Sequence, residues 1–214
     1  MQAKLVLFDC DGVIVDSAAT TFQCLRENLQ AYGLALTSGD LKELSGGATL
    51  AAMGDDLRRR GVDLPESWLE DFYVYLYERL DREVRIISGI SGVFDALDTA
   101  GIPYAVCSNG RLRKMEIMFE RVGLWGRLSR RLYSAQDMPA AKPAPDVYLR
   151  AAADAGVAPS DCAVIEDSVT GLRAARAAGM RSLGFFANEK PEKLEPLADI
   201  LFDDMRALPG LLGL

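Results

Sequence analysis

The sequence predicts an α/β protein with a Rossmann-like parallel sheet as its core and a helical cap domain inserted after the first strand. From about residue 103 onward, short apolar runs alternate with helical stretches. Such alternation indicates a parallel sheet that is covered by helices on both faces. Residues 16–87, by contrast, have helical periodicity throughout and contain no strand-like run.

The predicted strands are short and apolar along their whole length, as strands buried on both faces of a sheet must be. One strand precedes the helical insertion and the others follow it. A last short strand and a helix are expected within residues 201–214, at the edge of the core. The other predicted strands are 5–8, 104–107, 132–134, 163–165 and 182–186.

The stretches between the later strands predict helices of the core. Each of three such stretches is followed by a glycine, which adopts the left-handed conformation at a helix end without strain. These predicted helices are 111–122, 144–155 and 169–178, followed by Gly123, Gly156 and Gly179.

The inserted segment is expected to consist of helices alone. One side chain in every three or four of its last helix is a large apolar residue (Trp68, Phe72, Leu76, Leu80), which indicates a face packed in a core rather than a ligand site. The predicted helices are 17–32, a helix from Thr37 or Ser38 to residue 44, 49–60, and a helix from Pro65 to residue 82.

These elements predict two domains. The α/β core domain comprises residues 1–15 and 88–214, and the helical cap domain comprises residues 16–87. Residues 87–90 would form the linker that returns the chain to the core, with Gly89 allowing a turn.

Composition excludes several classes of function. The net charge of -7 argues against broad nucleic-acid binding, and no apolar run reaches the roughly 18 residues of a membrane span. The sequence contains no histidine, so the commonest general base and zinc ligand are missing. Its cysteines have no zinc-like spacing and are expected to be buried free thiols in a cytoplasmic protein; they are Cys10, Cys24, Cys107 and Cys162.

Polar side chains follow the predicted strands at the points where the strands end. Because ligands bind at the carboxyl ends of the strands in open parallel sheets, we expect these residues to meet at one rim. Ser168 could equally well cap the following helix, and Lys142 taken alone could be a surface turn residue. The residues are Asp9 and Asp11, Ser108 and Asn109, Lys142, and Glu166 and Asp167.

The rim would bring up to four carboxylates into a small volume. Like charges this close are unfavourable unless a cation compensates them. Oxygen ligands without histidine or clustered thiols suit a hard divalent ion, and Mg²⁺ is the natural choice. The sequence therefore predicts a magnesium site.

Four segments resemble the signature motifs of the haloacid dehalogenase-like hydrolases, in the same order and with similar spacing. The first segment is FDCDGVIVDS, from Phe8 to Ser17, and the others are CSNG from Cys107, KPAPD from Lys142, and IEDS from Ile165 with Gly171. The resemblance covers essentially the whole chain, and the helical insertion is similar to the family's cap domain.

The resemblance implies a phosphatase that forms an aspartyl-phosphate. Asp9 would be the nucleophile, and Asp11 would first protonate the leaving oxygen and then activate water. Asp9 and Asp167 would hold Mg²⁺ with the backbone carbonyl of Asp11, and Glu166 would be a further acidic ligand, through water or directly.

The resemblance also implies how the substrate would be held. Ser108, the backbone N–H of Asn109 and Lys142 would bind phosphate oxygens. Arg111 directly follows this loop and is a weaker candidate for contact with the substrate, since arginines on a helix face are often simply solvated. The partner would be a small phosphorylated metabolite, and the protein would be a monomer or a homodimer.

Other functions stay open within the resemblance. Dehalogenating relatives lack the second aspartate, so Asp11 favours phosphate over halide. A sugar-phosphate mutase similar to β-phosphoglucomutase is the main alternative, although the chain has no histidine, its turn from Gly46 to Thr49 has no arginine, and Ala18 replaces a frequent acidic residue. A non-catalytic binding protein is less favoured, because both Asp9 and Lys142 are present. Cys10 and the CSNG segment resemble a bacterial group that includes 6-phosphogluconate phosphatases.

Overall fold

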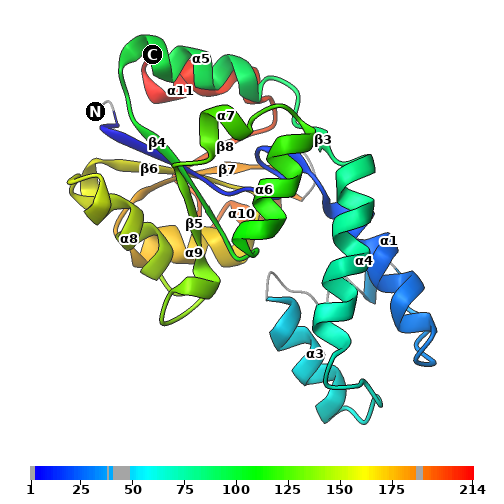
Figure 1. The fold of residues 1–214 in the computed structure, drawn as a ribbon. Coiled ribbons are helices and arrows are strands. Elements are labelled where there is room, and N and C mark those ends of the chain that lie inside the picture. The colour runs from blue at the N-terminus through cyan, green and yellow to red at the C-terminus, as the bar shows by residue number, and fades with distance from the viewer. Residues whose placement is uncertain (1–2, 38, 41–48, 187–189) are drawn as a thin grey trace.

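The core of the protein is a six-stranded parallel sheet with the strand order β5-β4-β1-β6-β7-β8 (Figure 1). The structure is a computed structural model, and it describes residues 3–37, 39–40, 49–186 and 190–214. The predicted α/β class and parallel sheet are confirmed. The strands are β1 (Leu5–Phe8), β4 (Tyr104–Ser108), β5 (Leu132–Ser134), β6 (Cys162–Glu166), β7 (Arg181–Phe185) and β8 (Ile200–Phe202).

Both faces of the sheet are buried, which explains why its strands are apolar throughout. Along β1, Val6 and Phe8 belong to one hydrophobic cluster, and Leu5 and Leu7 belong to another. Because successive side chains of a strand point to opposite faces, the two clusters lie on the two sides of the sheet. Each fully buried side chain of this size contributes about 1.5–3 kcal/mol to stability.

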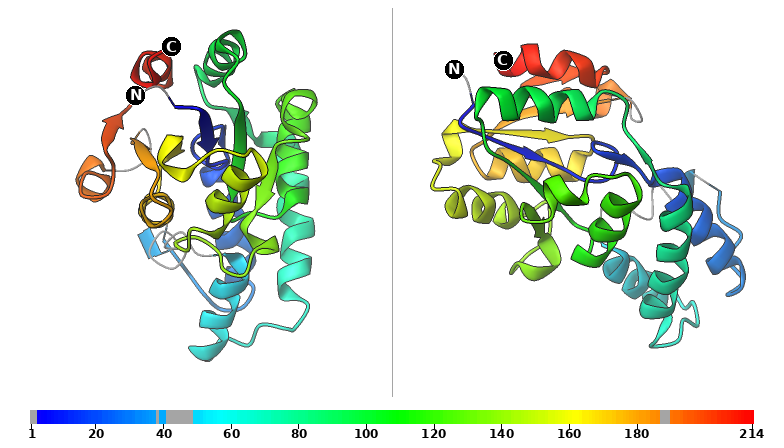
Figure 2. Two further views of the ribbon diagram at one scale, coloured as in Figure 1. Left: turned by 90° about the vertical axis from the view of Figure 1, so that its left-hand side faces the viewer. Right: turned by 45° about the horizontal axis from the view of Figure 1, so that its top comes forward.

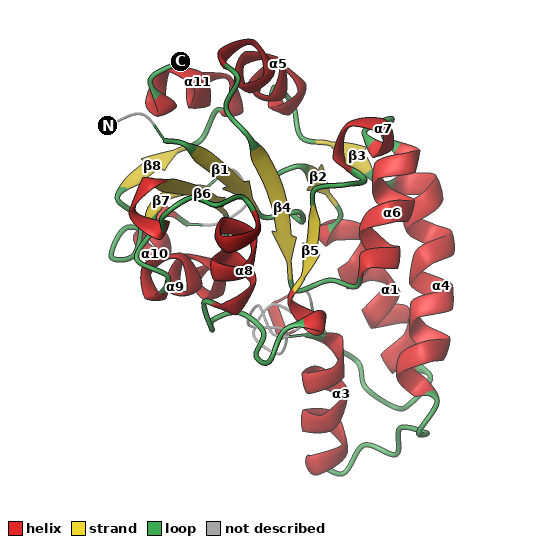
Figure 3. Cartoon of the chain, turned by 60° about the vertical axis from the view of Figure 1, so that its left-hand side comes forward, coloured by secondary structure: helices red, strands yellow, loops and turns green. Residues whose placement is uncertain are grey.

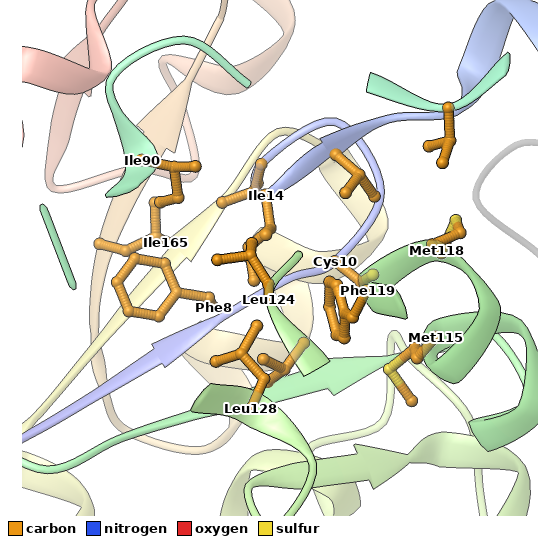
Figure 4. Packing of buried hydrophobic residues seen from close by; sticks show 14 of the residues in the cluster. Phe8, Cys10, Ile14, Ile90, Met115, Met118, Phe119, Leu124, Leu128 and Ile165 are labelled. Carbon is orange, nitrogen blue, oxygen red and sulfur yellow. The ribbon is translucent and has the colours of Figure 1, made fainter. Parts of the chain in front are cut away.

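The larger cluster covers the first face of the sheet. Phe8 packs edge-on against Phe94 of α5, with ring centroids 5.3 Å apart. Figure 4 shows Phe8 with further members of this cluster, among them residues of α5, α6 and α7. The helices on this face are α5 (Ile90–Ala100), α6 (Leu112–Arg121), α7 (Trp125–Leu128) and α11 (Leu208–Leu212).

The second face carries α8 (Asp146–Asp154) and α9 (Val169–Ala177), and the short α10 (Pro191–Leu194) packs beside α9 (Figure 3). Short 3₁₀ turns complete the core: η1 (Ala135–Asp137), η2 (Pro159–Asp161) and η3 (Met205–Ala207). The sequence predicts neither α5 nor α7. The last strand, β8, and α11 lie at the end of the chain as predicted, and β8 is an edge strand of the sheet.

Three helices within residues 18–83 form a separate group beyond the sheet (Figure 2). They are α1 (Ala18–Gln30), α3 (Leu50–Arg59) and α4 (Trp68–Glu83). The apolar stripe of α4 is buried as predicted, and the rings of Trp68 and Phe72 stack with centroids 5.7 Å apart. The helix predicted from Thr37 or Ser38 to residue 44 falls largely outside the described residues.

The chain passes between the sheet and these helices through a two-stranded antiparallel ribbon. In this ribbon β2 (Val15–Asp16) pairs with β3 (Arg85–Ile86), and the N–H of Ile87 continues the pairing by donating to the carbonyl of Ile14 at 2.9 Å. The predicted domain boundary at 15/16 falls within β2, and the boundary at 87/88 falls just after β3. The division into a core and a cap domain itself stays a prediction.

The strand order determines where a ligand can bind. The central strand β1 lies between β4 and β6, and the chain builds outward from β1 to β5 on one side and from β6 to β8 on the other. A crevice forms outside the carboxyl ends of the strands at such a reversal. The helical segment lies on this side, since the arrowheads of β4 and β5 point toward α3 in Figure 3. Among the described helices, none is both long and apolar enough to cross a membrane.

Candidate active site

A tight loop after β1 places two aspartates at the crevice. The N–H groups of Ile14 and Val15 both donate to the carbonyl of Cys10, at 3.0 and 3.1 Å, and so fold the loop back on itself. The Cys10 side chain is fully buried in the core, while Asp9 and Asp11 on either side of it line a pocket. The two-residue offset therefore presents both carboxylates to one space, as the sequence predicts.

Gly12 is required in this loop for two reasons. Its φ of +82° is a left-handed conformation that other residues adopt only with strain. A Cβ at Gly12 would also lie 1.9 Å from Oδ2 of Asp167. The absence of a side chain thus lets the carboxylate after β6 approach the backbone of the loop after β1.

Lys142 connects the ends of three strands. Its Nζ donates to Oδ1 of Asp9 at 2.6 Å, to Oε1 of Glu166 at 2.6 Å and to the carbonyl of Cys107 at 2.8 Å. The side chain is buried, so these acceptors compensate the cost of removing a charge from water. Burial alone would lower the pKa of Lys142, but the attraction of the two carboxylates outweighs burial and raises it. Lys142 is therefore a fixed positive charge beside Asp9.

Glu166 is fully buried and both of its carboxylate oxygens have partners. Oε1 accepts from Lys142 and from the hydroxyl of Tyr148 at 2.8 Å, and Oε2 accepts from the N–H of Ser168 at 3.2 Å and its hydroxyl at 2.9 Å. Ser168 also caps α9, since its Oγ accepts from the N–H of Gly171 at 3.0 Å. Glu166 thus anchors Lys142 and the start of α9.

The loop after β4 fixes the position of the backbone at Lys142. The side chain of Asn109 accepts a hydrogen bond from the N–H of Lys142 at 3.0 Å and donates one to its carbonyl at 3.4 Å. Ser108 Oγ accepts from the N–H of Gly110 at 2.9 Å and lines the pocket. The side chain of Asn109 therefore fixes the backbone that carries Lys142.

Asp11 is paired with Lys114, a residue that the sequence did not predict to lie in the site. Nζ of Lys114 donates to Oδ1 of Asp11 at 2.6 Å, and the hydroxyl of Ser17 donates to the same oxygen. Burial would raise the pKa of Asp11, but Lys114 and the two hydrogen bonds together hold it below its ordinary value. Lys114 stands in the first turn of α6, where the helix dipole favours acidic residues over basic ones. A lysine at this unfavourable position is the feature of the sequence that indicates a nearby carboxylate partner.

The site keeps an excess of negative charge. Among the residues that the structure describes at the pocket, four carboxylates (Asp9, Asp11, Glu166, Asp167) face two lysines, Lys114 and Lys142. Burial raises the pKa of Asp9 to about 7, because Lys142 offsets only part of the cost of ionising it beside Glu166 and Asp11. Burial and neighbouring carboxylates also raise the pKa of Asp167 well above its ordinary value.

The donor set fits a hard divalent cation. Asp9, Glu166 and Asp167 each offer an oxygen, and these atoms lie within 4.8 Å of one another. Unlike the other carboxylates, Asp167 accepts no side-chain hydrogen bond from any residue in the described part of the chain. Two uncompensated carboxylates and only oxygen ligands match a divalent ion such as Mg²⁺.

The pocket at this rim has a volume of about 270 Å³. Its floor is the polar cluster of the sheet, and its other wall comes from the helical segment. That wall is apolar or hydroxylic among the described residues, and the buried hydroxyl of Thr21 finds no partner among them. The residues of the wall are Ser17, Ala18, Thr21, Phe22, Leu25, Thr49, Leu50 and Tyr73.

Arg111 contacts α4 of the helical segment. Its guanidinium forms two hydrogen bonds with the carboxylate of Glu70 on α4, at 2.6 and 2.5 Å, and stacks 3.9 Å from the centre of the Tyr73 ring. It is not among the residues that line the pocket. In the structure Arg111 thus links the segment before α6 to α4 of the helical segment, and its contact with substrate stays a prediction. The turn around Gly46 lies outside the described residues.

The remaining sequence-predicted residues come together. Asp9, Asp11, Ser108, Asn109, Lys142, Glu166 and Asp167 all line the same pocket, although they lie on four segments of the chain. Tyr148 and Lys114 complete the cluster and were missed. Tyr148 lies inside α8, where an aromatic residue normally indicates core packing, so no signal distinguished it.

The chain was compared with known proteins. The family model for haloacid dehalogenase-like hydrolases matches residues 6–185. A phosphoglycolate phosphatase of Agrobacterium fabrum is 31% identical over 218 residues, which cover 96% of this chain and 91% of the relative. A 6-phosphogluconate phosphatase of Escherichia coli is 27% identical over 212 residues, covering 98% and 95%.

Solved structures give the same result. A haloacid dehalogenase-like protein from Agrobacterium tumefaciens is 33% identical, with a TM-score of 0.81 and coverage of 99% of this chain and 98% of that one. A HAD family hydrolase from Deinococcus radiodurans, crystallised with phosphate and sodium bound, is 28% identical with a TM-score of 0.78, covering 99% and 97%. On these matches and on its site, the chain belongs to the haloacid dehalogenase-like hydrolases.

Proposed function

We propose that this hydrolase is a Mg²⁺-dependent phosphatase that transfers a phosphoryl group from a small metabolite to Asp9 and then to water. The observation that carries the proposal is the loop after β1, which presents Asp9 and Asp11 to one pocket. Asp9 is held there by a buried lysine, and Asp167 approaches the same loop over Gly12. Residues 16–87 would act as the cap over this pocket.

Asp9 has the position of a nucleophile. In the first step a carboxylate oxygen of Asp9 attacks phosphorus, and the bond from phosphorus to the ester oxygen breaks. The ester oxygen keeps the electron pair and takes a proton from Asp11. In the second step Asp11 takes a proton from water, the water oxygen attacks phosphorus, and phosphate leaves Asp9.

Asp11 must change its protonation state during this cycle. The contact with Lys114 favours the ionised form, which suits the base of the second step. Arrival of an anionic phosphoryl group beside Asp11 adds a like charge, which raises the pKa of a carboxyl group. The substrate itself would thus favour the protonated form that the first step needs.

The phosphate oxygens would be held by the hydroxyl of Ser108, the backbone N–H of Asn109 and the ammonium of Lys142. Catalysis of phosphoryl transfer consists mostly of positioning and of neutralising charge on these oxygens. Lys142 is suited to this role because Glu166 and the Cys107 carbonyl fix its position, while the N–H that donates to Asp9 would turn to a phosphate oxygen. Ser108 keeps its hydroxyl hydrogen for donation, since its oxygen accepts from Gly110.

Asp9, Asp167 and the backbone carbonyl of Asp11 are the residues that would hold Mg²⁺. When bound, the ion would offset negative charge on the phosphoryl group and on the carboxylates. Glu166 fits an outer role through water, because four donors already occupy its two oxygens.

The substrate class we propose is a sugar phosphate or a sugar-acid phosphate. The pocket of about 270 Å³ fits a small ester, and the Thr21 hydroxyl offers a contact for a substrate hydroxyl group. Two relatives are named for 6-phosphogluconate and phosphoglycolate, which both carry a carboxylate. 6-Phosphogluconate is therefore the first ester to try, and the free buried thiols fit a cytoplasmic enzyme.

Phosphate release from a panel of sugar phosphates, sugar-acid phosphates, phosphoglycolate and p-nitrophenyl phosphate tests the proposal. We expect release that requires Mg²⁺ and that falls by at least about 10³-fold in Asp9→Asn, since the amide cannot act as a nucleophile. The exposed carboxylate of Asp81 supplies the matched control, Asp81→Asn, which should keep full activity. Conversion of glucose 1-phosphate to glucose 6-phosphate without release would instead make the enzyme a mutase.

A further inference from the structure

Lys114 contacts Asp11, the proposed general acid–base, whereas Lys142 contacts Asp9, the proposed nucleophile. We propose that Lys114 is a positioning residue for Asp11, which fixes the Asp11 carboxylate so that Oδ2 exchanges the proton with the leaving group. This inference rests on the proposed function, because it assigns the atom through which Asp11 acts. Each of these two buried lysines would then position one aspartate: Lys142 positions Asp9, and Lys114 positions Asp11.

The hydrogen bonds of Asp11 are one-sided. Lys114 and Ser17 both donate to Oδ1, from α6 and from the residue before α1 respectively. Within the described chain nothing donates to Oδ2. Two donors from different elements restrict rotation of the carboxylate, and a catalytic group that is held in one orientation reacts faster than a mobile one. Oδ2 is left as the oxygen available to the ester.

Lys114 is buried at a cost in free energy that Asp11 offsets more than any other described residue. The side chain is 11% exposed and lies in the first turn of α6, where the helix dipole disfavours a cation. Removal from water would lower the pKa of Lys114, yet the carboxylate of Asp11 raises it. In the described structure its only hydrogen-bond acceptor is Oδ1 of Asp11.

Gly110 provides the space that this arrangement needs. A Cβ at Gly110 would lie 3.4 Å from Cδ of Lys114 and 3.2 Å from Oγ of Ser108. The distance to Oγ of Ser108 is closer than ordinary van der Waals contact, and the distance to Cδ of Lys114 is at the short limit of such contact. The lysine stem therefore passes over the backbone of the phosphate loop to reach Asp11, and the loop and the acid–base are positioned together.

The test compares kcat/KM for two esters, because this constant reports the step in which the leaving group departs. p-Nitrophenolate leaves without protonation, whereas an alkoxide needs a proton from Asp11. We expect Lys114→Met to lower kcat/KM for an alkyl or sugar phosphate by about 10- to 100-fold, and for p-nitrophenyl phosphate by less than about threefold. Ser17→Ala should show the same selectivity with a smaller loss.

Two further variants separate positioning from general damage. Arg113→Met changes a neighbouring cation on α6 that is 59% exposed and pairs with Glu116, and it should leave both constants unchanged. Lys114→Arg keeps the charge and should recover part of the activity toward the alkyl ester. Both Lys114 variants and Arg113→Met should unfold cooperatively, which keeps loss of fold out of the comparison.

An equal loss for both esters in Lys114→Met would overturn the inference. So would a loss that appears only as a higher KM for esters with a second anionic group, because Lys114 would then bind substrate. Asp11→Ala provides the reference: it should lose far more activity toward the alkyl ester than toward p-nitrophenyl phosphate. If Asp11→Ala shows no such selectivity, the role proposed for Asp11 is wrong, which is a different failure from that of Lys114 alone.

Discussion

Gly171 shows how a missing side chain organises the site. The carboxylate of Glu166 occupies the space that a side chain at Gly171 would fill, since a Cβ there would lie 1.7 Å from Oε1. Glu166 in turn holds Lys142, which holds Asp9. A glycine in the first turn of α9 thus determines where the proposed nucleophile lies.

Replacing Gly171 with alanine should damage both stability and activity. The added methyl group would displace Glu166 and leave a buried carboxylate and a buried lysine imperfectly paired, which costs about 3 kcal/mol of unfolding free energy. Chemical denaturation of Gly171→Ala measures this loss, and phosphate release should fall with it. Gly126→Ala is the matched control, because a Cβ at Gly126 meets nothing within 4 Å; an equal effect in both variants would contradict the argument.

The cysteines should react slowly in the folded protein. All four are buried free thiols, and burial raises the pKa of Cys107 and raises that of Cys162 to about 11. Since the thiolate is the reactive form, iodoacetamide at pH 8 should modify them only after denaturant is added. Rapid modification of Cys10 or Cys107 in the native state, detected by mass spectrometry, would contradict their placement.

At the residue scale, the sequence predicted the groups that follow strands and missed those that lie within helices. Asp9, Asp11 and Asp167 could be predicted to meet because the ends of parallel strands share one rim. Lys114 and Tyr148 reach the same rim from the inside of α6 and α8. The direction in which these two side chains point depends on how each helix is rotated about its axis against the sheet, and a single sequence does not determine that rotation.

At the scale of elements, α4 and α6 are linked across the boundary between the sheet and the helical segment. Arg111, which precedes α6, pairs with Glu70 of α4 and stacks on Tyr73 of the same helix. Glu70 is 67% exposed, so this ion pair adds little stability. Its contribution is to orient the wall of the pocket that Tyr73 lines.

Arg111→Met should therefore leave substrate binding nearly intact. We expect the KM for the preferred ester to stay within about twofold of that of the wild type, because the lost contact is to the protein and not to the phosphate. Steady-state kinetics checks this, with Lys142→Met as the variant that should lose activity almost completely. A tenfold rise in KM would show that Arg111 reaches the substrate after all.

Elements with strong periodicity were predictable, and connecting elements were not. The strands after residue 103 and the helices α6, α8 and α9 lie close to their predicted ranges, because apolar strands and terminal glycines mark them. Helix α5 begins directly after Gly89, whose φ of +93° ends the ribbon, so linker and helix merge in the sequence. Helix α7 is four residues long, too short to show a period.

At the scale of the whole molecule, charge connects the fold to the reaction. The protein carries a net charge of -7, and the described lining of its pocket also has more carboxylates than cations. An anionic substrate would be repelled from such a site unless a cation is bound there. The order of the strands places β1 beside β6 and so brings Asp9 and Asp167 together at the centre of the sheet, an adjacency within the predicted rim that the sequence does not determine.

Mg²⁺ should stabilise the folded protein through this site. A ligand that binds only the native state at about 100 times its Kd adds roughly 2.7 kcal/mol to the unfolding free energy. Thermal unfolding with Mg²⁺ or with EDTA should therefore differ in Tm, and Asp167→Asn should reduce the difference. The Asp81→Asn protein should keep it in full, and an unchanged shift in Asp167→Asn would place the ion elsewhere.

The central claim is that Asp9 carries the phosphoryl group, and trapping that adduct tests it most directly. An acyl phosphate is reduced by borohydride, which would convert Asp9 to homoserine. The account predicts that mass spectrometry finds this change at Asp9 when p-nitrophenyl phosphate and Mg²⁺ are both present, and not when either is left out. Steady release of phosphate under the same conditions, with Asp9 unmodified, would contradict the account.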